Sequence, residues 1–391
     1  MSIPKKTVAV IFGGKSAEHD VSIITAHIPI IESLLVSGQF EVIPVYIAKD
    51  GSWYSEPSMN SLSYFKDPSY AEGLARQKKI GLLFDNGLKL IWPGLRLRVQ
   101  PIDIVFPAMH GTFGEDGSLM GLLRMANVPY VGCDLFSSAV AMDKVLTKQV
   151  ISAEGVPVVP YVWFTKFHWQ EDKKSCVQAV ESLSYPLFVK PVHLGSSIGI
   201  SKIKTPKELE NAVEVAFHYD NKVLVEQAVQ NLIEVTLPIM GNDILQFGQI
   251  ERPMNKSDFF DFNDKYISGN QKGSGANSQY SEIPANIEEH LKEQVVAFGK
   301  KTYTALGCSG IARIDFLIEG VQKKVYVNEV NTLPGSLYHH NWKKSGVSGL
   351  ALVTKLIDLA FERFSAEQTA TFAFPSDILR TIGGNKTQKY R

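Results

Sequence analysis

The stretch from residue 7 to residue 47 constrains the fold more than any other part of the sequence. Residues 7–12 (TVAVIF) form a short, β-branched apolar run that stops at Gly13-Gly14, which predicts a buried strand and a tight turn. Apolar residues at helical spacing follow and end near Gly38, and residues 41–47 (EVIPVYI) form a second apolar run. A strand, a helix and a strand in this order make a βαβ unit, so we expect a parallel sheet covered by helices.

A small insertion precedes the next strand of this sheet. Residues 50–100 show weak periodicity, but Asn86-Gly87 lies between apolar flanks, which predicts a hairpin with a type I′ turn. Residues 103–107 give another buried strand, which ends at His110-Gly111. We therefore expect an open α/β sheet domain over residues 1–137.

The 391 residues are enough for two or three domains. A helix over 137–154 leads into a second domain at 138–229, with strands at 187–190, 199–203 and 222–226 and a helix at 206–217. A third, strand-rich domain at 230–365 has strands expected at 234–240, 246–252, 311–318 and 325–330 and helices at 287–305 and 350–364. Residues 366–391 are polar and weakly periodic, so we interpret them as a tail.

The composition excludes several classes of protein. Lys+Arg and Asp+Glu each number 40, so the net charge of +0 gives no attraction to nucleic acid or anionic membranes, and we expect neither as a partner. The three cysteines, Cys133, Cys176 and Cys308, are far apart, which excludes a disulfide framework and favours a cytoplasmic location. No stretch approaches the roughly 20 apolar residues of a membrane span, and no targeting segment is expected.

The strongest chemical pattern is the pair of segments IARIDFLI and VYVNEVN. Residues two apart share a strand face, so Arg313 lies beside Asp315, and Glu329 lies beside Asn331. A hairpin centred near residue 322 places Asp315 almost opposite Glu329, where two carboxylates repel unless a cation lies between them. The oxygens of Asp315, Glu329 and Asn331 suit Mg²⁺, with Mn²⁺ as an alternative. The other interpretation is an exposed polar face with a cross-strand salt bridge.

A second pattern is FVKPVHLGSSIGIS, in which a strand delivers Lys190 to a loop of small residues. Backbone N–H groups at 195–197 would cradle phosphate while the lysine supplies charge, although a plain hairpin with a solvated lysine fits equally well. Glu226 ends one strand and Glu234 opens the next, where they either accept hydrogen bonds from a ligand or face solvent.

Other features are weaker alone. Gly14-Lys15-Ser16 lacks the earlier glycine of a P-loop, and no GxGxxG follows the first strand. His110 and Glu18 lie in loops at strand ends, where α/β sheets place ligands. The adjacent pair His339-His340 is wrong for two metal ligands on one helix face, so we expect packing or hydrogen bonding.

Seven segments occur along the chain in a characteristic order: GGKSAEHDVS, HGTFGEDGSLMGLL, AVAMDKVLTK, VKPVHLGSSIG, DKYISG, ARIDF and NEVNTLPG. Together they resemble the D-alanine–D-alanine ligases of the ATP-grasp superfamily, from about residue 8 to residue 364. The resemblance implies an ATP-grasp fold, in which an N-terminal open parallel α/β sheet domain is joined to two α+β domains that clamp ATP.

The resemblance also implies roles for individual residues. The nucleotide would be bound by Lys144, Lys190, Ser197, Glu226, Val229, Glu234 and Lys265, and two Mg²⁺ ions by Asp315, Glu329 and Asn331. The catalytic group would comprise Glu18, Ser196, Tyr266, Arg313 and Gly335, and the amino-acid substrates would contact Glu18, His110 and His340. Residues 268–278 (SGNQKGSGANS) would form a lid that shields the reaction from water.

The implied reaction joins two D-alanines through an acyl phosphate, in the cytoplasm and in a homodimer, to give D-alanyl-D-alanine for peptidoglycan. One departure leaves the second amino acid open: His340 falls where the family usually has a serine, and Asn341 follows where a hydrophobic residue is common. The resemblance also implies that Tyr266 favours an amine over a hydroxy-acid acceptor. The alternatives are the same chemistry with another second amino acid, or a nucleotide-binding protein that has lost catalysis.

Overall fold

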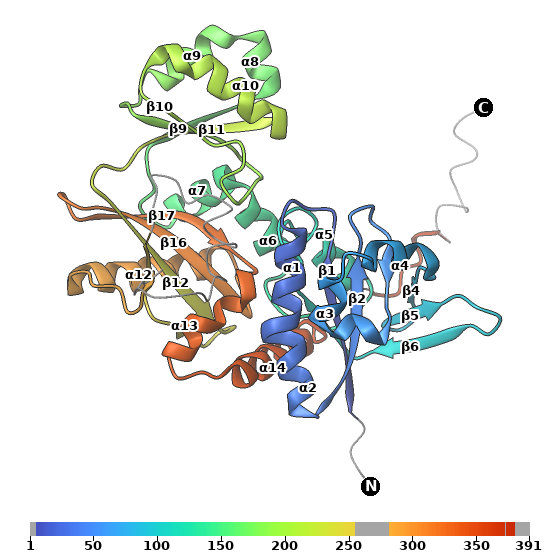
Figure 1. The fold of residues 1–391 in the computed structure, drawn as a ribbon. Coiled ribbons are helices and arrows are strands. Elements are labelled where there is room, and N and C mark those ends of the chain that lie inside the picture. Colours follow the sequence, from blue (N-terminus) through green and yellow to red (C-terminus); the bar gives the residue numbers. More distant parts are fainter. Residues whose placement is uncertain (1–4, 255–280, 372, 380–391) are drawn as a thin grey trace, which may run out of the picture.

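The computed structural model describes residues 5–254, 281–371 and 373–379. Within these residues, three four-stranded sheets organise the molecule (Figure 1). The blue N-terminal sheet lies on one side, the orange and yellow C-terminal sheet on the other, and a green central sheet above the C-terminal one.

The N-terminal sheet has the strand order β3-β2-β1-β7. Strand β1 (Lys6–Gly13) pairs in parallel with β2 (Phe40–Ile47) and β7 (Ile104–Pro107), while the short edge strand β3 (Trp53–Tyr54) is antiparallel. The βαβ prediction is therefore confirmed, and seven of the eight residues of β1 are buried, as expected for a strand covered on both faces.

The crossover between β1 and β2 is one long helical path. It consists of α1 (His19–Thr25), a π-helical segment η1 (Ala26–Ile31) and α2 (Glu32–Ser37). Pro29 lies within η1 and has no N–H to donate, which accounts for the locally wider turn. The path ends at Gly38 with φ +63°, as predicted.

By length and composition, the stretch His19–Ser37 is long and apolar enough to cross a membrane, although no such stretch was expected from the sequence. However, 56% of its most apolar window is buried inside the structure, as in the core helix of a folded domain. The three cysteines are free and buried.

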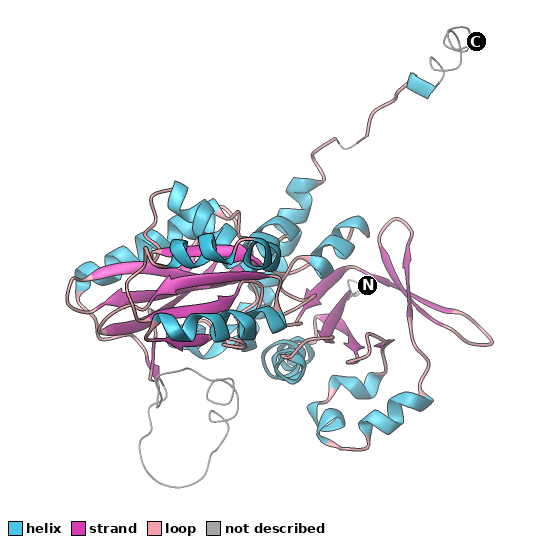
Figure 2. Ribbon diagram, turned by 90° about the horizontal axis from the view of Figure 1, so that it is seen from above, coloured by secondary structure: helices cyan, strands magenta, loops and turns pink. Residues whose placement is uncertain are grey.

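The predicted hairpin forms, but its turn is longer than expected. Strand β4 (Gly81–Phe84) pairs with β5 (Leu88–Trp92), and Phe84 lies opposite Leu88, so the loop holds three residues rather than two. Strand β6 (Arg98–Ile102) completes a ribbon that projects from the side of the molecule in both views (Figures 1 and 2).

The single helix expected over 137–154 is wrong. The structure has α6 (Leu135–Met142) and α7 (Lys144–Ala153), separated by Asp143 in an extended conformation. The Asp143 carboxylate accepts hydrogen bonds from the N–H groups of Val145 at 2.8 Å and Leu146 at 2.9 Å. Aspartate is a strong N-cap residue, so it starts a new helix directly before Lys144.

The central sheet has the order β10-β9-β11-β8, all antiparallel. Its elements are β8 (Tyr161–Thr165), α8 (Lys166–Glu171), α9 (Lys173–Val180), β9 (Leu187–Pro191), β10 (Ser201–Ile203), α10 (Leu209–Tyr219) and β11 (Lys222–Gln227). β8, α8 and α9 were not predicted from the sequence. The three helices cover the sheet face that points away from the rest of the molecule (Figure 1).

The C-terminal sheet has the order β13-β12-β16-β17 and is antiparallel. It comprises β12 (Leu232–Met240), β13 (Gln246–Phe247), β16 (Ile311–Glu319) and β17 (Lys324–Asn331), with α12 (Glu289–Ala305) packed on it. The strand expected at 246–252 is broken, because the N–H of Gln249 is bound by the Asn341 side chain at 3.0 Å instead of a neighbouring strand. The chain then enters β14 (Arg252–Pro253), which pairs with β15 (Ser281–Glu282).

The long C-terminal helix α14 (Gly349–Glu367) packs on the N-terminal domain. Its buried residues Leu352, Leu356 and Leu359 share one apolar cluster with β1 and the crossover helix. The remaining elements are η2 (Pro57–Asn60), α3 (Leu62–Lys66), α4 (Tyr70–Arg76), α5 (Ser118–Met125), η3 (Pro206–Glu208), η5 (Gly335–Tyr338) and α13 (His339–Lys344).

Candidate active site

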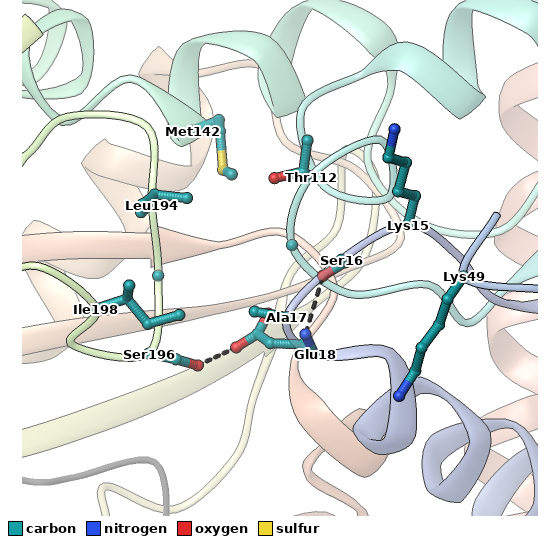
Figure 3. A pocket seen from close by; sticks show the side chains of 12 residues that line it. Lys15, Ser16, Ala17, Glu18, Lys49, Thr112, Met142, Leu194, Ser196 and Ile198 are labelled. Atoms are coloured by element: carbon teal, nitrogen blue, oxygen red, sulfur yellow. Dashed lines mark hydrogen bonds between the residues drawn. The ribbon is translucent and has the colours of Figure 1, made fainter. Parts of the chain in front are cut away.

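A pocket of about 320 Å³ lies where the loop after β1 meets the loop after β9. Glu18 enters it from the first loop and Ser196 from the second, and the serine hydroxyl donates a hydrogen bond to the glutamate (Figure 3). The Glu18 N–H is held by Ser16 Oγ at 3.0 Å. The structure thus joins two predicted site residues that are 178 positions apart in the sequence.

Gly111 forms the wall of this pocket behind Glu18. Its φ is +68°, and a Cβ atom there would lie 2.6 Å from Ser16 Oγ and 3.1 Å from Glu18 Oε2. Only glycine leaves room for the carboxylate at this distance and adopts this backbone conformation without strain.

His110 is buried and does not line the pocket, whereas its neighbours Gly111 and Thr112 do. One ring nitrogen lies 2.7 Å from Thr25 Oγ1, and the other lies 3.5 Å from Glu115. Thr25 Oγ1 also accepts the N–H of Ser336 at 2.9 Å. This connects His110 to the segment that begins at Gly335.

The segment after Gly335 has an unusual backbone. Ser336, Leu337 and Tyr338 have φ values of 49°, 52° and 53°, so three consecutive residues with side chains adopt the left-handed region. Such conformations cost free energy and cluster at functional sites. They turn the chain sharply between β17 and α13 and hold Gly335 close to the crossover helix.

The predicted carboxylate pair is confirmed in its geometry. Asp315 on β16 lies directly opposite Glu329 on β17, and Arg313 lies opposite Asn331. The Arg313 guanidinium holds both Asp315 oxygens at 2.7 Å, and Lys144 Nζ lies 3.9 Å from Glu329. Despite burial, the negative charge of Asp315 raises the pKa of Arg313, which therefore stays charged.

The two predicted phosphate-binding lysines, Lys144 and Lys190, approach the pair from different elements. Lys144 begins α7 and donates from Nζ to the carbonyl of Leu194 at 2.6 Å. Lys190 on β9 contacts Glu226 on β11, and the charges of Glu329 and Glu234 also act on it. Burial lowers the pKa of this lysine, but the neighbouring carboxylates raise the pKa by more, so Lys190 remains a cation.

Glu226 lies in a buried group of three charges. Its second oxygen lies 2.9 Å from Lys148 Nζ, and the side chains of Lys148 and Glu226 are only 1% and 2% exposed. Burial raises the pKa of Glu226, but the two lysines more than offset this effect and lower it below the ordinary value. Lys148 was not predicted from the sequence, although its position four residues after Lys144 places both lysines on one face of a helix.

His340 contacts an acidic partner. Its Nε2 lies 3.0 Å from Glu251 Oε2, and the side chain is 46% exposed. Its ring lies 4.6 Å from that of Tyr338, which in turn lies 5.2 Å from the Arg313 guanidinium. The neighbouring Asn341 is buried and binds Gln249 and Glu251, which explains a polar residue at this position.

The remaining predicted site residues lie on β12, in the loops after β9 and β11, or outside the described residues. Ser197 is half-buried with φ 59°, Val229 is half-buried after β11, and Glu234 lies on β12 opposite Leu317. Lys265, Tyr266 and the proposed lid at 268–278 lie outside the described residues. Among the described residues, no group of three or more His, Cys, Asp or Glu side chains is arranged to hold a metal ion.

Known proteins share the sequence and the fold of this chain. The family models described as "D-ala D-ala ligase N-terminus" and "D-ala D-ala ligase C-terminus" match residues 7–133 and 150–358. Similar curated proteins include the D-alanine–D-alanine ligases of Thermosipho africanus, 37% identical over 95% of this chain and 97% of that protein, and of Thermosipho melanesiensis, 39% identical over 91% and 94%.

Similar solved structures include the D-alanine–D-alanine ligase of Coxiella burnetii, with a TM-score of 0.75, 31% identity and coverage of 93% of this chain and 96% of that one. The VanG D-Ala:D-Ser ligase of Enterococcus faecalis has a TM-score of 0.73, 32% identity and coverage of 91% and 100%. With two family models spanning most of its length and relatives above 30% identity, this chain belongs to the D-alanine–D-alanine ligase family of ATP-dependent ligases.

Proposed function

We propose that this enzyme uses ATP to join two D-alanine molecules into D-alanyl-D-alanine for peptidoglycan, through an acyl phosphate. The observation that carries the proposal is the meeting of the Asp315–Glu329 pair with two cationic side chains, Arg313 on the same strand as Asp315 and Lys144 on α7. Phosphoryl transfer needs such positioned charges more than it needs a side-chain nucleophile.

The first D-alanine would bind in the 320 Å³ pocket. The Glu18 carboxylate would accept hydrogen bonds from its ammonium group, and Ser196 would hold Glu18 in place through the hydrogen bond already present. His110 would act by fixing Thr25 and the backbone at Ser336 beside this pocket.

ATP would lie between the central and C-terminal sheets. Its phosphates would be held by Lys144, Lys190, Ser197 and Lys265, its adenine by Glu226 and Val229, and its ribose by Glu234. Since Glu226 is already engaged by Lys190 and Lys148, its contribution to the adenine site would include fixing Lys190.

The oxygen donors of Asp315, Glu329 and Asn331 fit Mg²⁺. Two carboxylates and an amide on neighbouring strands make a hard, all-oxygen set that leaves positions for phosphate oxygens. Bound there, Mg²⁺ or Mn²⁺ would neutralise phosphate charge. Arg313 and Lys265 would stabilise charge on the transferred phosphoryl group, and the N–H of Gly335 would donate to the tetrahedral oxyanion. Tyr266 would help to close the site.

A second candidate keeps this chemistry but changes the second amino acid. His340 is paired with the buried Glu251, close to Tyr338 and Arg313. The side chain predicted to contact the second amino acid is therefore an imidazole instead of the serine hydroxyl usual in the family. A D-Ala:D-Ser ligase is also among the similar structures. The acceptor is therefore a matter for a substrate panel.

We propose that the enzyme is a cytoplasmic homodimer that acts on free amino acids. We expect no nucleic acid or membrane partner, because a net charge of +0 gives no general attraction to nucleic acid or to anionic membranes. The division into domains at 1–137, 138–229, 230–365 and 366–391 is part of the same proposal.

The test is ADP release with ATP, Mg²⁺ and D-alanine. The Glu329→Gln variant keeps the size of the side chain but removes a metal-binding charge, so we expect its turnover to fall by at least ~100-fold. Glu319→Gln is the matched control, since it lies in the same hairpin at the opposite end, across from Lys324. Wild-type turnover in Glu329→Gln would remove this residue from the mechanism, and bound ATP without turnover in the wild type would favour a non-catalytic role.

A further inference from the structure

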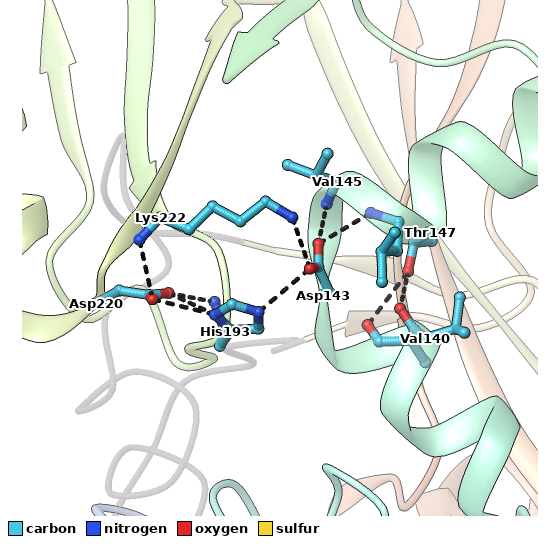
Figure 4. Close-up of polar contacts among 9 residues, drawn as sticks. Val140, Asp143, Val145, Thr147, His193, Asp220 and Lys222 are labelled. Atoms are coloured by element: carbon cyan, nitrogen blue, oxygen red, sulfur yellow. Dashed lines mark hydrogen bonds and ion pairs between the residues drawn. The ribbon is translucent and has the colours of Figure 1, made fainter. Parts of the chain in front are cut away.

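His193 lies between two carboxylates that come from different parts of the chain. Its Nε2 is 3.2 Å from Asp143 Oδ2, and its Nδ1 is 3.0 Å from Asp220 Oδ2 (Figure 4). Its backbone N–H also donates to Asp220 at 2.7 Å. Since a carboxylate only accepts, both ring nitrogens must donate for both contacts to form, and only the imidazolium has two N–H groups.

The charges around the ring balance when the ring carries a proton. The charged groups that face it are Asp143 from the break between α6 and α7, Asp220 from the end of α10, and Lys222 from the start of β11. Lys222 Nζ lies 2.8 Å from the same Asp143 oxygen. Removal of the proton would leave two nearly buried carboxylates and one neighbouring cation, Lys222, whose Nζ contacts Asp143.

This cluster joins two bodies of the structure. Ala141 of α6 and Ile151 of α7 belong to the apolar core of the C-terminal sheet, whereas Asp220 ends α10 and Lys222 begins β11 of the central sheet. His193 therefore ties the start of α7 to the central sheet at the place where the two bodies meet.

The cluster lies next to the proposed phosphate-binding residues. Asp143 directly precedes Lys144 and caps its helix, and the N–H of Lys144 lies 3.4 Å from the carbonyl of Val192. The residue after His193 is Leu194, whose carbonyl accepts a hydrogen bond from Lys144 Nζ. Any shift of His193 thus moves both Lys144 and the loop that carries Ser196 and Ser197.

We propose that the His193 imidazolium is a positioning residue for nucleotide binding, which fixes Lys144 and the 194–197 loop by bridging Asp143 and Asp220. This inference rests on the proposed placement of ATP between the central and C-terminal sheets. It assigns to His193 no contact with the nucleotide.

The proposal has a signature in pH. Hydrogen bonds from Asp143 and Asp220 outweigh burial and raise the pKa of His193 to about 9 from the ordinary 6.5. The bridge is therefore intact below pH 6.5 and at neutral pH, and it is lost as the pH rises through about 9. If only the bridged form binds well, the dissociation constant of the nucleotide rises about fourfold at about pH 9.5, where about a quarter of the histidine stays charged.

The experiment measures binding of a non-hydrolysable ATP analogue with Mg²⁺ by calorimetry, on the full chain, from about pH 7.5 to about pH 9.5. No amino acid is present, so the ammonium group of alanine does not enter. His193→Gln should bind several-fold more weakly at pH 7.5 and show no further loss at high pH. His193→Arg keeps a permanent charge and a planar fork for two carboxylates, so it should bind as the wild type does at pH 7.5 and lose the decline at high pH.

His218→Gln is the matched control, because His218 is exposed on α10, which packs on the same sheet. This variant should follow the wild-type curve. Thermal unfolding at pH 7.5 checks that each variant is folded. A flat wild-type profile, or weak binding by both His193 variants, would overturn the inference alone. No binding by the wild type at any pH would overturn the proposed function and this inference with it.

Discussion

At the scale of single residues, the site depends on close approaches that only certain side chains allow. Glu18 is only 9% exposed and lies against Gly111. Ser16 accepts a hydrogen bond from its backbone N–H, and Ser196 donates one to its carboxylate. The absence of a Cβ atom at residue 111 is what leaves this space.

Gly111→Ala should therefore damage the first-substrate site more than the fold. The new methyl group would displace Ser16 Oγ or Glu18 Oε2, so we expect the KM for D-alanine to rise by about tenfold or more, as misplacement of a binding group does. Gly155→Ala is the control, since Gly155 has a similar φ of +72° with nothing within 4 Å. It should show only the backbone strain of about 1 kcal/mol in unfolding. Equal KM values in the two variants would contradict this account of the pocket.

Several residue contacts were predictable from the sequence because they are local. The pairing of Asp315 with Glu329 follows from a short hairpin and from the two-residue period of strands. The ion pairs of His193 were not predictable, because Asp143 and Asp220 are 50 and 27 positions away and no periodicity links them. The distance between Glu18 and Ser196 in the sequence is also large, and only the family resemblance placed them together.

At the scale of elements, the decisive feature is the break between α6 and α7. Apolar spacing continues through Asp143, so the sequence pattern predicts one helix. The structure starts a second helix there, because the aspartate side chain satisfies the N–H groups of Val145 and Leu146. The break aims the first residue of α7, Lys144, towards Leu194 and Glu329.

Two substitutions at Asp143 separate its roles. Asp143→Asn keeps a good N-cap but removes the charge that faces Lys222 and His193, whereas Asp143→Ala removes both. We expect the alanine variant to lose about 1 kcal/mol more stability than the asparagine variant, measured by urea unfolding. We expect the KM for ATP to rise in both. Equal stability of the two variants would show that the cap contributes nothing to α7.

At the scale of the whole molecule, the C-terminal helix connects the parts. α14 follows the C-terminal sheet in the chain but buries its apolar face against β1 and the crossover helix of the N-terminal domain. The pocket with Glu18 and Ser196 is lined by residues between Lys15 and Ile198, so α14 acts on the packing of the N-terminal domain and does not line the pocket. The sequence predicts the helix from its apolar period, but it cannot predict the partner, since many buried surfaces suit such a face.

Leu356→Ala tests the contribution of this docking. Leu356 is fully buried in the shared core, so the substitution should lower the free energy of unfolding by about 2–5 kcal/mol. Leu350→Ala, on the same helix but 39% exposed, should cost less than about 1 kcal/mol. Urea unfolding measures both values. Similar losses for the two variants would mean that the docking of α14 adds little to the stability of the molecule.

This molecule is expected to make a dipeptide from two D-alanines. The most direct measurement is mass spectrometry of the product formed from ATP, Mg²⁺ and D-alanine, first alone and then with a panel of second amino acids, with ADP release recorded in parallel. We expect D-alanyl-D-alanine from D-alanine alone, in an amount equal to the ADP released. A dipeptide that appears only with another second amino acid, or ADP release without any dipeptide, would contradict this expectation.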